Sequence, residues 1–209
     1  MQCLAHSGSF KSTLIIIIIM GRVNLNRPLI FPSSPRCPGM GVKRSLQIAG
    51  LTLSIFADLL LLLAAATDFW VRSPEGHRGL WRECHQDSCS AATCETMVAI
   101  SAACLMLSLG AEVTGTTLGI WVLQGPKNTM GVHRGRTAWA LCFLSTFLLI
   151  MAMVVFTLRE VMRGDVFFSW SYFCSWLALP FTILSGLCFL FADMIIQGND
   201  AIREFPVCL

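Results

Sequence analysis

Charged residues are scarce in this chain of 209 residues: they make up 13 % of it, against 55 % hydrophobic residues and a mean hydropathy of +0.68. Soluble globular domains carry roughly 25 % charged residues. A soluble protein with so little charge would expose large apolar patches and aggregate. The composition therefore excludes an ordinary soluble enzyme and indicates that lipid surrounds much of the surface.

Motifs for catalysis and for nucleic-acid binding are missing as well. The chain contains no P-loop, no Rossmann glycine pattern, no G-x-S-x-G and no H-E-x-x-H. Its four histidines form no catalytic cluster, and its basic residues form no stripe interleaved with aromatic residues. We therefore expect a protein that is not an enzyme and that has no cofactor, no metal site and no nucleic-acid partner.

Long apolar stretches dominate the chain instead. A helix that crosses the roughly 30 Å hydrocarbon layer needs about 20 mostly apolar residues, and it must pair all its backbone polar groups internally. Such stretches lie at residues 46–69, 97–123, 138–158 and 172–196. They predict a mainly α-helical membrane protein, a four-helix bundle in the lipid bilayer formed by residues 40–209.

Basic residues near the ends of these stretches predict the orientation. Residues 124–136 hold three basic side chains and no acidic one, and Lys43 and Arg44 precede the first stretch without an acid. Cytoplasmic segments are enriched in Lys and Arg. We therefore expect cytoplasmic N- and C-termini, outside loops at residues 70–96 and 159–171, and a multi-pass protein of the plasma membrane.

The first 39 residues differ from this domain. Their apolar stretch around Ile15 to Ile19 is too short to span a bilayer, although it is similar to the hydrophobic part of a secretory signal. A cleaved signal would place the basic segment that follows it outside, against the orientation predicted above. We expect residues 1–39 to be a disordered or spurious extension, with Met40 as a start in its own right.

The first outside loop contains a distinctive set of residues. Trp70 stands where the first helix leaves the membrane, a position that tryptophan favours because its ring is apolar and its N–H polar. Gly79 permits backbone shapes that other residues resist. Leu80 and Trp81 then offer a large apolar surface, and Cys84 follows. This pattern predicts a loop that docks on the bilayer edge or on the end of the bundle.

The second outside loop ends in a further motif, Phe-Ser-Trp-Ser-Tyr at residues 168–172. Together with the loop pattern above, it resembles the superfamily of claudins, peripheral myelin protein, epithelial membrane proteins and the lens fibre membrane protein. The resemblance covers residues 40–209 and implies a claudin-like fold, in which a small extracellular antiparallel β element lies over four helices. The residues that carry it are Trp70, Gly79, Leu80, Trp81, Cys84, Phe168, Ser169 and Trp170.

Three cysteines, Cys84, Cys89 and Cys94, lie in the first outside loop. Cys84 and Cys94 have the spacing of the claudin disulfide, whereas Cys84 and Cys89 would suit a tight hairpin. Either pairing leaves one thiol over, which could join a second chain. The sequence leaves both pairings open.

Three acidic residues, Asp58, Glu112 and Asp193, fall inside the apolar stretches. An ionisable group at membrane depth is costly and is a functional hypothesis by default. A transport path is one interpretation. We favour a structural one, in which a protonated carboxyl group hydrogen-bonds to a hydroxyl group of a neighbouring helix. The expected partners are Ser54, Thr114 and Ser145.

Small residues and cysteines suggest further contacts. Ala111, Gly115 and Gly119 recur on one helix face and allow close helix packing, within the bundle or in a homo-oligomer. Cys142 and Cys208 are candidates for palmitoylation. The C-terminal Val-Cys-Leu fits the edge of a PDZ domain.

The resemblance implies a structural, cell-contact or membrane-organising role. An accessory regulatory subunit of another membrane protein, such as a channel, is the alternative. A paracellular pore is the weakest expectation, because residues 70–96 form a shorter loop than the one claudins use for their pores.

Overall fold

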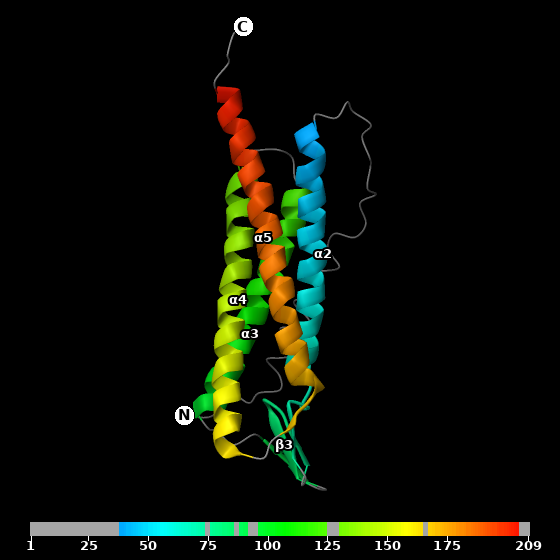
Figure 1. The fold of residues 1–209 in the computed structure, drawn as a ribbon, viewed down its shortest axis with the longest axis vertical. Coiled ribbons are helices and arrows are strands. Elements are labelled where there is room, and N and C mark those ends of the chain that lie inside the picture. Colours follow the sequence, from blue (N-terminus) through cyan, green and yellow to red (C-terminus); the bar gives the residue numbers. More distant parts are fainter. Residues whose placement is uncertain are drawn as a thin grey trace.

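The structure is a computed structural model, and it describes residues 38–73, 76–85, 88–91, 96–124, 130–164 and 167–204. Four long helices run side by side in an elongated bundle, with a small sheet at one end (Figure 1). They are α2 (Pro38–Ala66), α3 (Thr96–Gln124), α4 (Met130–Arg163) and α5 (Trp170–Glu204). The helices pack in a ring, in which α2 and α4 each lie between α3 and α5.

All four helices are long and apolar enough to cross a membrane, over Gly41–Ala66, Thr96–Gln124, Gly135–Arg163 and Trp170–Ile195. The four predicted stretches are therefore confirmed, but the helix ends differ from the hydropathy boundaries. Hydropathy detects only the segment that suits lipid, whereas a helix can continue in water. Consequently α2 begins at Pro38, two residues before the predicted domain boundary, and α5 continues to Glu204.

The segment predicted as the second outside loop, residues 159–171, is partly helical. Helix α4 continues to Arg163, and α5 already begins at Trp170. Gly164 ends α4: its φ of 73° is left-handed, and its N–H donates to the carbonyl of Val161 at 3.3 Å. A left-handed residue of this kind, usually glycine, is a common helix stop.

The sheet is antiparallel and has five strands in the order β4-β3-β2-β1-β5. The strands are β1 (Val71–Ser73), β2 (Gly76–Arg78), β3 (Arg82–His85), β4 (Ser88–Ala91) and β5 (Phe167–Phe168). The first four come from the segment between α2 and α3, as the family resemblance implied. The fifth strand comes from the segment between α4 and α5, where Phe168 pairs with Val71. The β element is therefore larger than a single hairpin.

One hydrophobic cluster joins the sheet to the bundle. Trp70, Val71 and Leu80 from the sheet end pack with side chains of all four helices, and each of these three is at most 3 % exposed. The helix members at the centre include Leu61, Leu105, Leu109, Leu149, Met153, Phe156 and Tyr172. The sheet is thus part of the same core as the helices.

Candidate functional site: the sheet and its anchor on the bundle

Two tryptophans hold the sheet on the end of α2. The indole Nε1 of Trp70 donates to the carbonyl of Ala64 at 2.9 Å, and that of Trp81 donates to the carbonyl of Ala65 at 2.7 Å. The last carbonyl groups of a helix lack partners within the helix. The two tryptophans of the sequence pattern therefore cap the C-terminal end of α2 and hold the segment that follows against it.

Trp70 also connects three elements through its backbone and its ring. Its N–H donates to the carbonyl of Arg78 at 3.1 Å, and its own carbonyl accepts from the N–H of Ser169 at 2.9 Å. The ring is 1 % exposed and meets Phe156 and Tyr172 edge-on, with centroids 4.9 and 6.5 Å away. Aromatic pairs in this arrangement are favourable beyond the area they bury.

Gly79 lies against the backbone of Asp68. A Cβ atom on Gly79 would stand 2.4 Å from the Cα atom of Asp68, a distance at which the backbone would have to move. Only glycine therefore allows the turn from β2 to β3 to approach the end of α2 so closely. The next residue, Leu80, is 3 % exposed and lies in the hydrophobic cluster.

Asp68 is a half-buried acid at this junction. Burial raises the pKa of its carboxyl group above the ordinary value. The positive charges of Arg82 and His77 and backbone hydrogen bonds from Trp81 and Arg82 act in the opposite direction without cancelling the effect of burial. The junction therefore contains a titratable group next to the Gly-Leu-Trp turn.

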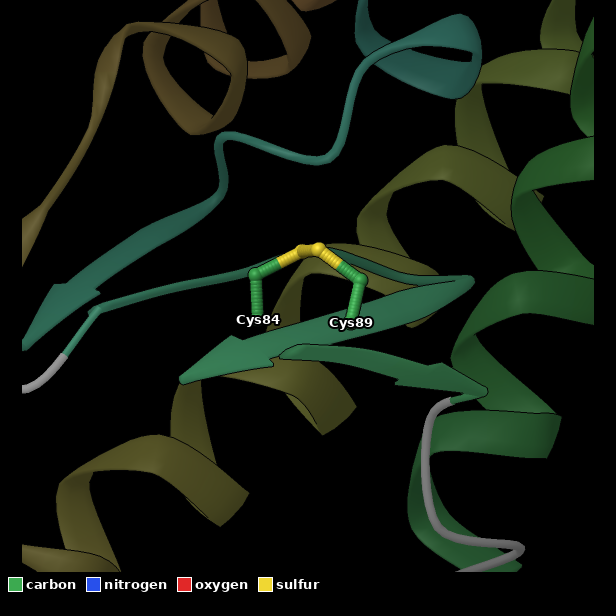
Figure 2. The surroundings of a disulfide bond; sticks show 2 residues. All are labelled: Cys84 and Cys89. Atoms are coloured by element: carbon green, nitrogen blue, oxygen red, sulfur yellow. A yellow bond between two sulfur atoms is a disulfide. The ribbon is translucent and has the colours of Figure 1, made fainter. Parts of the chain in front are cut away.

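A disulfide bond joins β3 to β4, the strand at one edge of the sheet. Cys84 of β3 and Cys89 of β4 are bonded, and they face each other directly in the register, with Cα atoms 4.1 Å apart (Figure 2). Antiparallel partners in a non-hydrogen-bonded pair approach to about 4.5 Å. Of the two pairings that the sequence left open, the structure has the one within the hairpin. Cys94, the other candidate, lies outside the described residues.

Charged side chains form a second link between sheet and bundle, one that the sequence analysis missed. Arg78 of β2 forms an ion pair with Glu83 of β3 and lies 3.9 Å from Glu160 of α4, which is fully buried. Glu160 is also paired with Arg159. Arg159 and Glu160 stand in the part of α4 that was predicted to be a loop, so no sequence signal connected them to Arg78.

The motif before the last helix has a clear position. Phe168 stacks on Tyr172 with ring centroids 4.2 Å apart, and the carbonyl of Ser169 accepts hydrogen bonds from the N–H groups of Tyr172 and Phe173. Trp170 is different, because it is 47 % exposed and stacks at 6.4 Å on Phe69, itself 44 % exposed. The motif therefore combines an anchor with an exposed aromatic surface.

The predicted helix-packing residues lie inside the bundle. A Cβ atom on Gly115 would be 3.2 Å from the sulfur of Cys142 in α4, and one on Gly119 would be 2.8 Å from the ring of Phe189 in α5. Ala111, the third residue of this set, is partly buried. Both glycines thus allow close approach between helices of the same chain.

The two palmitoylation candidates differ in what the structure says of them. Cys142 is fully buried, and its packing against Gly115 leaves no room for an acyl chain. Its position along the helix alone could not reveal that Cys142 faces inward. Cys208 lies outside the described residues, as does the C-terminal Val-Cys-Leu segment.

The acidic residues in the spans have polar partners, in part those expected. Ser54 donates to Glu112 at 3.1 Å, as predicted, and Thr116 donates to Asp58 at 2.9 Å. Asp193 is 3 % exposed, accepts a hydrogen bond from Gln197 at 2.8 Å and lies 4.0 Å from Arg136. Within the described part of the chain, no group of three or more metal-ligating side chains occurs. The described residues thus form a closely packed helix bundle with the sheet fixed to one end of it.

Comparison with known proteins shows that the sequence is similar to those of one family of membrane proteins. Residues 44–189 match the sequence model of the PMP-22/EMP/MP20/Claudin family. Claudin domain-containing protein 2 of Homo sapiens is 48 % identical over 170 residues, which are 81 % of this chain and 100 % of that protein. The protein of the same name from Mus musculus is 43 % identical over the same shares. Lens fiber membrane intrinsic protein of Bos taurus is 30 % identical over 154 residues, 68 % of this chain and 88 % of that protein.

Proposed function

Because this multi-pass membrane protein belongs to the PMP-22/EMP/MP20/Claudin family, we propose that it is a non-enzymatic structural protein that organises membranes at cell contacts. Its sheet is the contact element, and its helices anchor that element in the lipid bilayer. The alternative is an accessory subunit of another membrane protein, such as a channel.

The observation that supports this role is the firm attachment of the sheet to the bundle. Two indole hydrogen bonds and the Arg78–Glu160 contact hold the sheet on the bundle, and the disulfide bond ties β3 to β4 within the sheet. Residues 88–90 of β4 and the side chains of Arg72 and Arg82 are exposed on it. A binding surface that is ordered beforehand loses less conformational entropy when it meets a partner.

The proposed role requires the sheet to face the outside of the plasma membrane, with both termini in the cytoplasm. Helices α2 and α4 begin at the end of the bundle opposite the sheet (Figure 1). Lys43 and Arg44 lie near the start of α2 and Arg136 near the start of α4, in agreement with the positive-inside rule. The Cys84–Cys89 bond is in keeping with an oxidising compartment on the sheet side.

A paracellular pore is a weaker proposal. Strands β1 to β4 have only three or four residues each, which leaves little surface to line a channel between cells. Binding of a PDZ domain to the C-terminal Val-Cys-Leu would add a cytoplasmic partner to the contact role, and lateral homo-oligomers would concentrate the protein there.

Mixed-cell imaging tests the proposal. Cells that express the chain with a C-terminal fluorescent tag are grown with cells that lack it. A contact protein that binds its own kind concentrates at borders between two expressing cells and not at mixed borders. A uniform distribution, together with co-purification of a channel, would contradict the contact role and favour the accessory role.

A variant of the sheet provides the matched control. The double variant Cys84→Ser/Cys89→Ser should reach the cell surface but lose its enrichment at borders, because β3 and β4 are no longer tied together. Cys104→Ser, which changes a free cysteine of α3, should behave as the unchanged protein. Equal enrichment of all three proteins would show that the sheet is not the contact element.

A further inference from the structure

A chain of four polar side chains crosses from α2 to α3 inside the bundle. Asp58 Oδ2 is 2.9 Å from Thr116 Oγ1, Thr116 Oγ1 is 2.5 Å from Ser54 Oγ, and Ser54 Oγ is 3.1 Å from Glu112 Oε1. Thr116 Oγ1 also lies 3.0 Å from the backbone carbonyl of Glu112. A carboxyl group therefore stands at each end of the chain, and two hydroxyl groups stand between them.

The number of hydrogens available to these four side chains shows whether both carboxyl groups can be ionised. Each of the four oxygen–oxygen contacts is short enough for a hydrogen bond, and each hydrogen bond needs one hydrogen between its two oxygens. The two hydroxyl groups of Ser54 and Thr116 supply one hydrogen each. With both carboxyl groups ionised, only two hydrogens serve the four contacts, so in at least two contacts the lone pairs of the two oxygens would face each other with no hydrogen between them. One proton on a carboxyl group reduces this to one contact without a hydrogen. A proton on each carboxyl group gives every contact its hydrogen.

The surroundings also disfavour two negative charges. Glu112 is fully buried, with 0 % of its surface exposed, so it touches neither water nor lipid. Its Oε2 has no hydrogen-bond partner among the described residues. Oδ1 of Asp58 is likewise buried without a partner there. An ionised carboxylate in an apolar interior is costly unless it is paired. None of the ion pairs between described residues involves Asp58 or Glu112.

The groups that face this chain from the other helices are neutral or acidic. Helix α4 contributes Ser145 and the thiol of Cys142 next to Glu112, and α5 contributes Ser185 next to Cys142. The titratable groups of the cluster are thus Asp58, Glu112 and Cys142, and none of them can bring a positive charge. Only a bound proton can supply the missing hydrogen and remove a negative charge.

We propose that Asp58 and Glu112, joined through Thr116 and Ser54, form a proton-binding site that holds at least one acid proton inside the bundle at neutral pH. The bound proton completes the hydrogen-bonded link between α2 and α3. When one proton is present, it can lie on either carboxyl group, because reversing the two hydroxyl groups passes a hydrogen along the chain without any net change in bonding. This site is independent of the contact role proposed for the sheet.

Infrared spectroscopy of the full-length protein in lipid nanodiscs at neutral pH tests the proposal. A protonated carboxyl group has a C=O stretching band that a carboxylate lacks. We expect such a band in the unchanged protein, and we expect it to shift when the protein is labelled with ¹³C at the side-chain carboxyl of aspartate or of glutamate.

Amide variants identify the site. Asp58→Asn and Glu112→Gln keep the shape of each side chain and supply an N–H donor in place of the acid proton, so both should fold. Each should weaken or move the band, whereas Glu83→Gln, which changes an acid paired with Arg78 in the sheet, should leave it unchanged. Absence of the band from the unchanged protein, or a band that neither amide variant alters, would overturn the proposal. The isotope experiment needs no substitution and decides the question even if a variant fails to fold.

Discussion

The indole Nε1 of Trp81 donates a hydrogen bond to the backbone carbonyl of Ala65, at 2.7 Å and across 16 residues of sequence. The contact joins the Gly-Leu-Trp turn of the sheet to the last turn of the first membrane helix. Together with the bond from Trp70 to Ala64, it explains why α2 ends at Ala66 instead of continuing to the hydropathy boundary at residue 69.

Replacement of Trp81 by phenylalanine should destabilise the protein by about 1–3 kcal/mol, because an acceptor at the helix end loses its donor while most of the ring remains. Reversible unfolding in mixed detergent micelles measures the change. Trp170→Phe is the matched control, since Trp170 is exposed and should change stability by no more than about 0.5 kcal/mol. Equal effects of the two substitutions would contradict the capping role.

Gly79→Ala should destabilise the sheet end by about 1–3 kcal/mol, because the new Cβ atom would stand 2.4 Å from the Cα atom of Asp68 and the backbone would have to shift. Gly110→Ala is the control. It lies in the middle of α3 with no atom within 4 Å of a new Cβ, so it should be neutral or stabilising by about 0.5–1 kcal/mol. Unfolding of both variants under the same conditions gives the comparison.

The disulfide bond predicts a specific pattern of thiol reactivity. In Cys94→Ser, the bond between Cys84 and Cys89 should persist, so neither cysteine should react with a maleimide before reduction. In Cys84→Ser, the thiol of Cys89, which is exposed, should become reactive. Mass spectrometry of the labelled protein measures both results, and loss of the bond in Cys94→Ser would instead support a pairing with Cys94. Removal of the bond should cost about 2 kcal/mol of stability.

Asp68 predicts a pH dependence of stability. The pKa of its carboxyl group is raised by burial, so the folded protein binds the proton more tightly than the unfolded chain does. The free energy of unfolding should therefore fall as pH rises from the ordinary pKa of aspartate to the raised one, and then level off. Asp68→Asn removes the titration and should flatten this slope without loss of stability at neutral pH. Unfolding measured across the acid range tests this, and an unchanged slope in Asp68→Asn would contradict it.

The sequence by itself determined the parts of the fold that depend on local composition. Four apolar runs give four spanning helices, because the free energy of placing a helix in lipid is a sum over consecutive residues. The tryptophans and the Gly-Leu-Trp motif marked the region that packs on the bundle, because an apolar surface in a polar loop must be covered. These signals require no knowledge of which helices are neighbours.

Only the tertiary structure decided which groups meet. Ser54 and Glu112 are 58 residues apart in the chain, and hydropathy cannot tell which face of each helix points inward. The same limit concealed the burial of Cys142, the pairing of Cys84 with Cys89, the strand β5 and the Arg78–Glu160 contact. Each of these depends on distances of a few ångströms between elements, and those distances are fixed only when the helices and the sheet pack together.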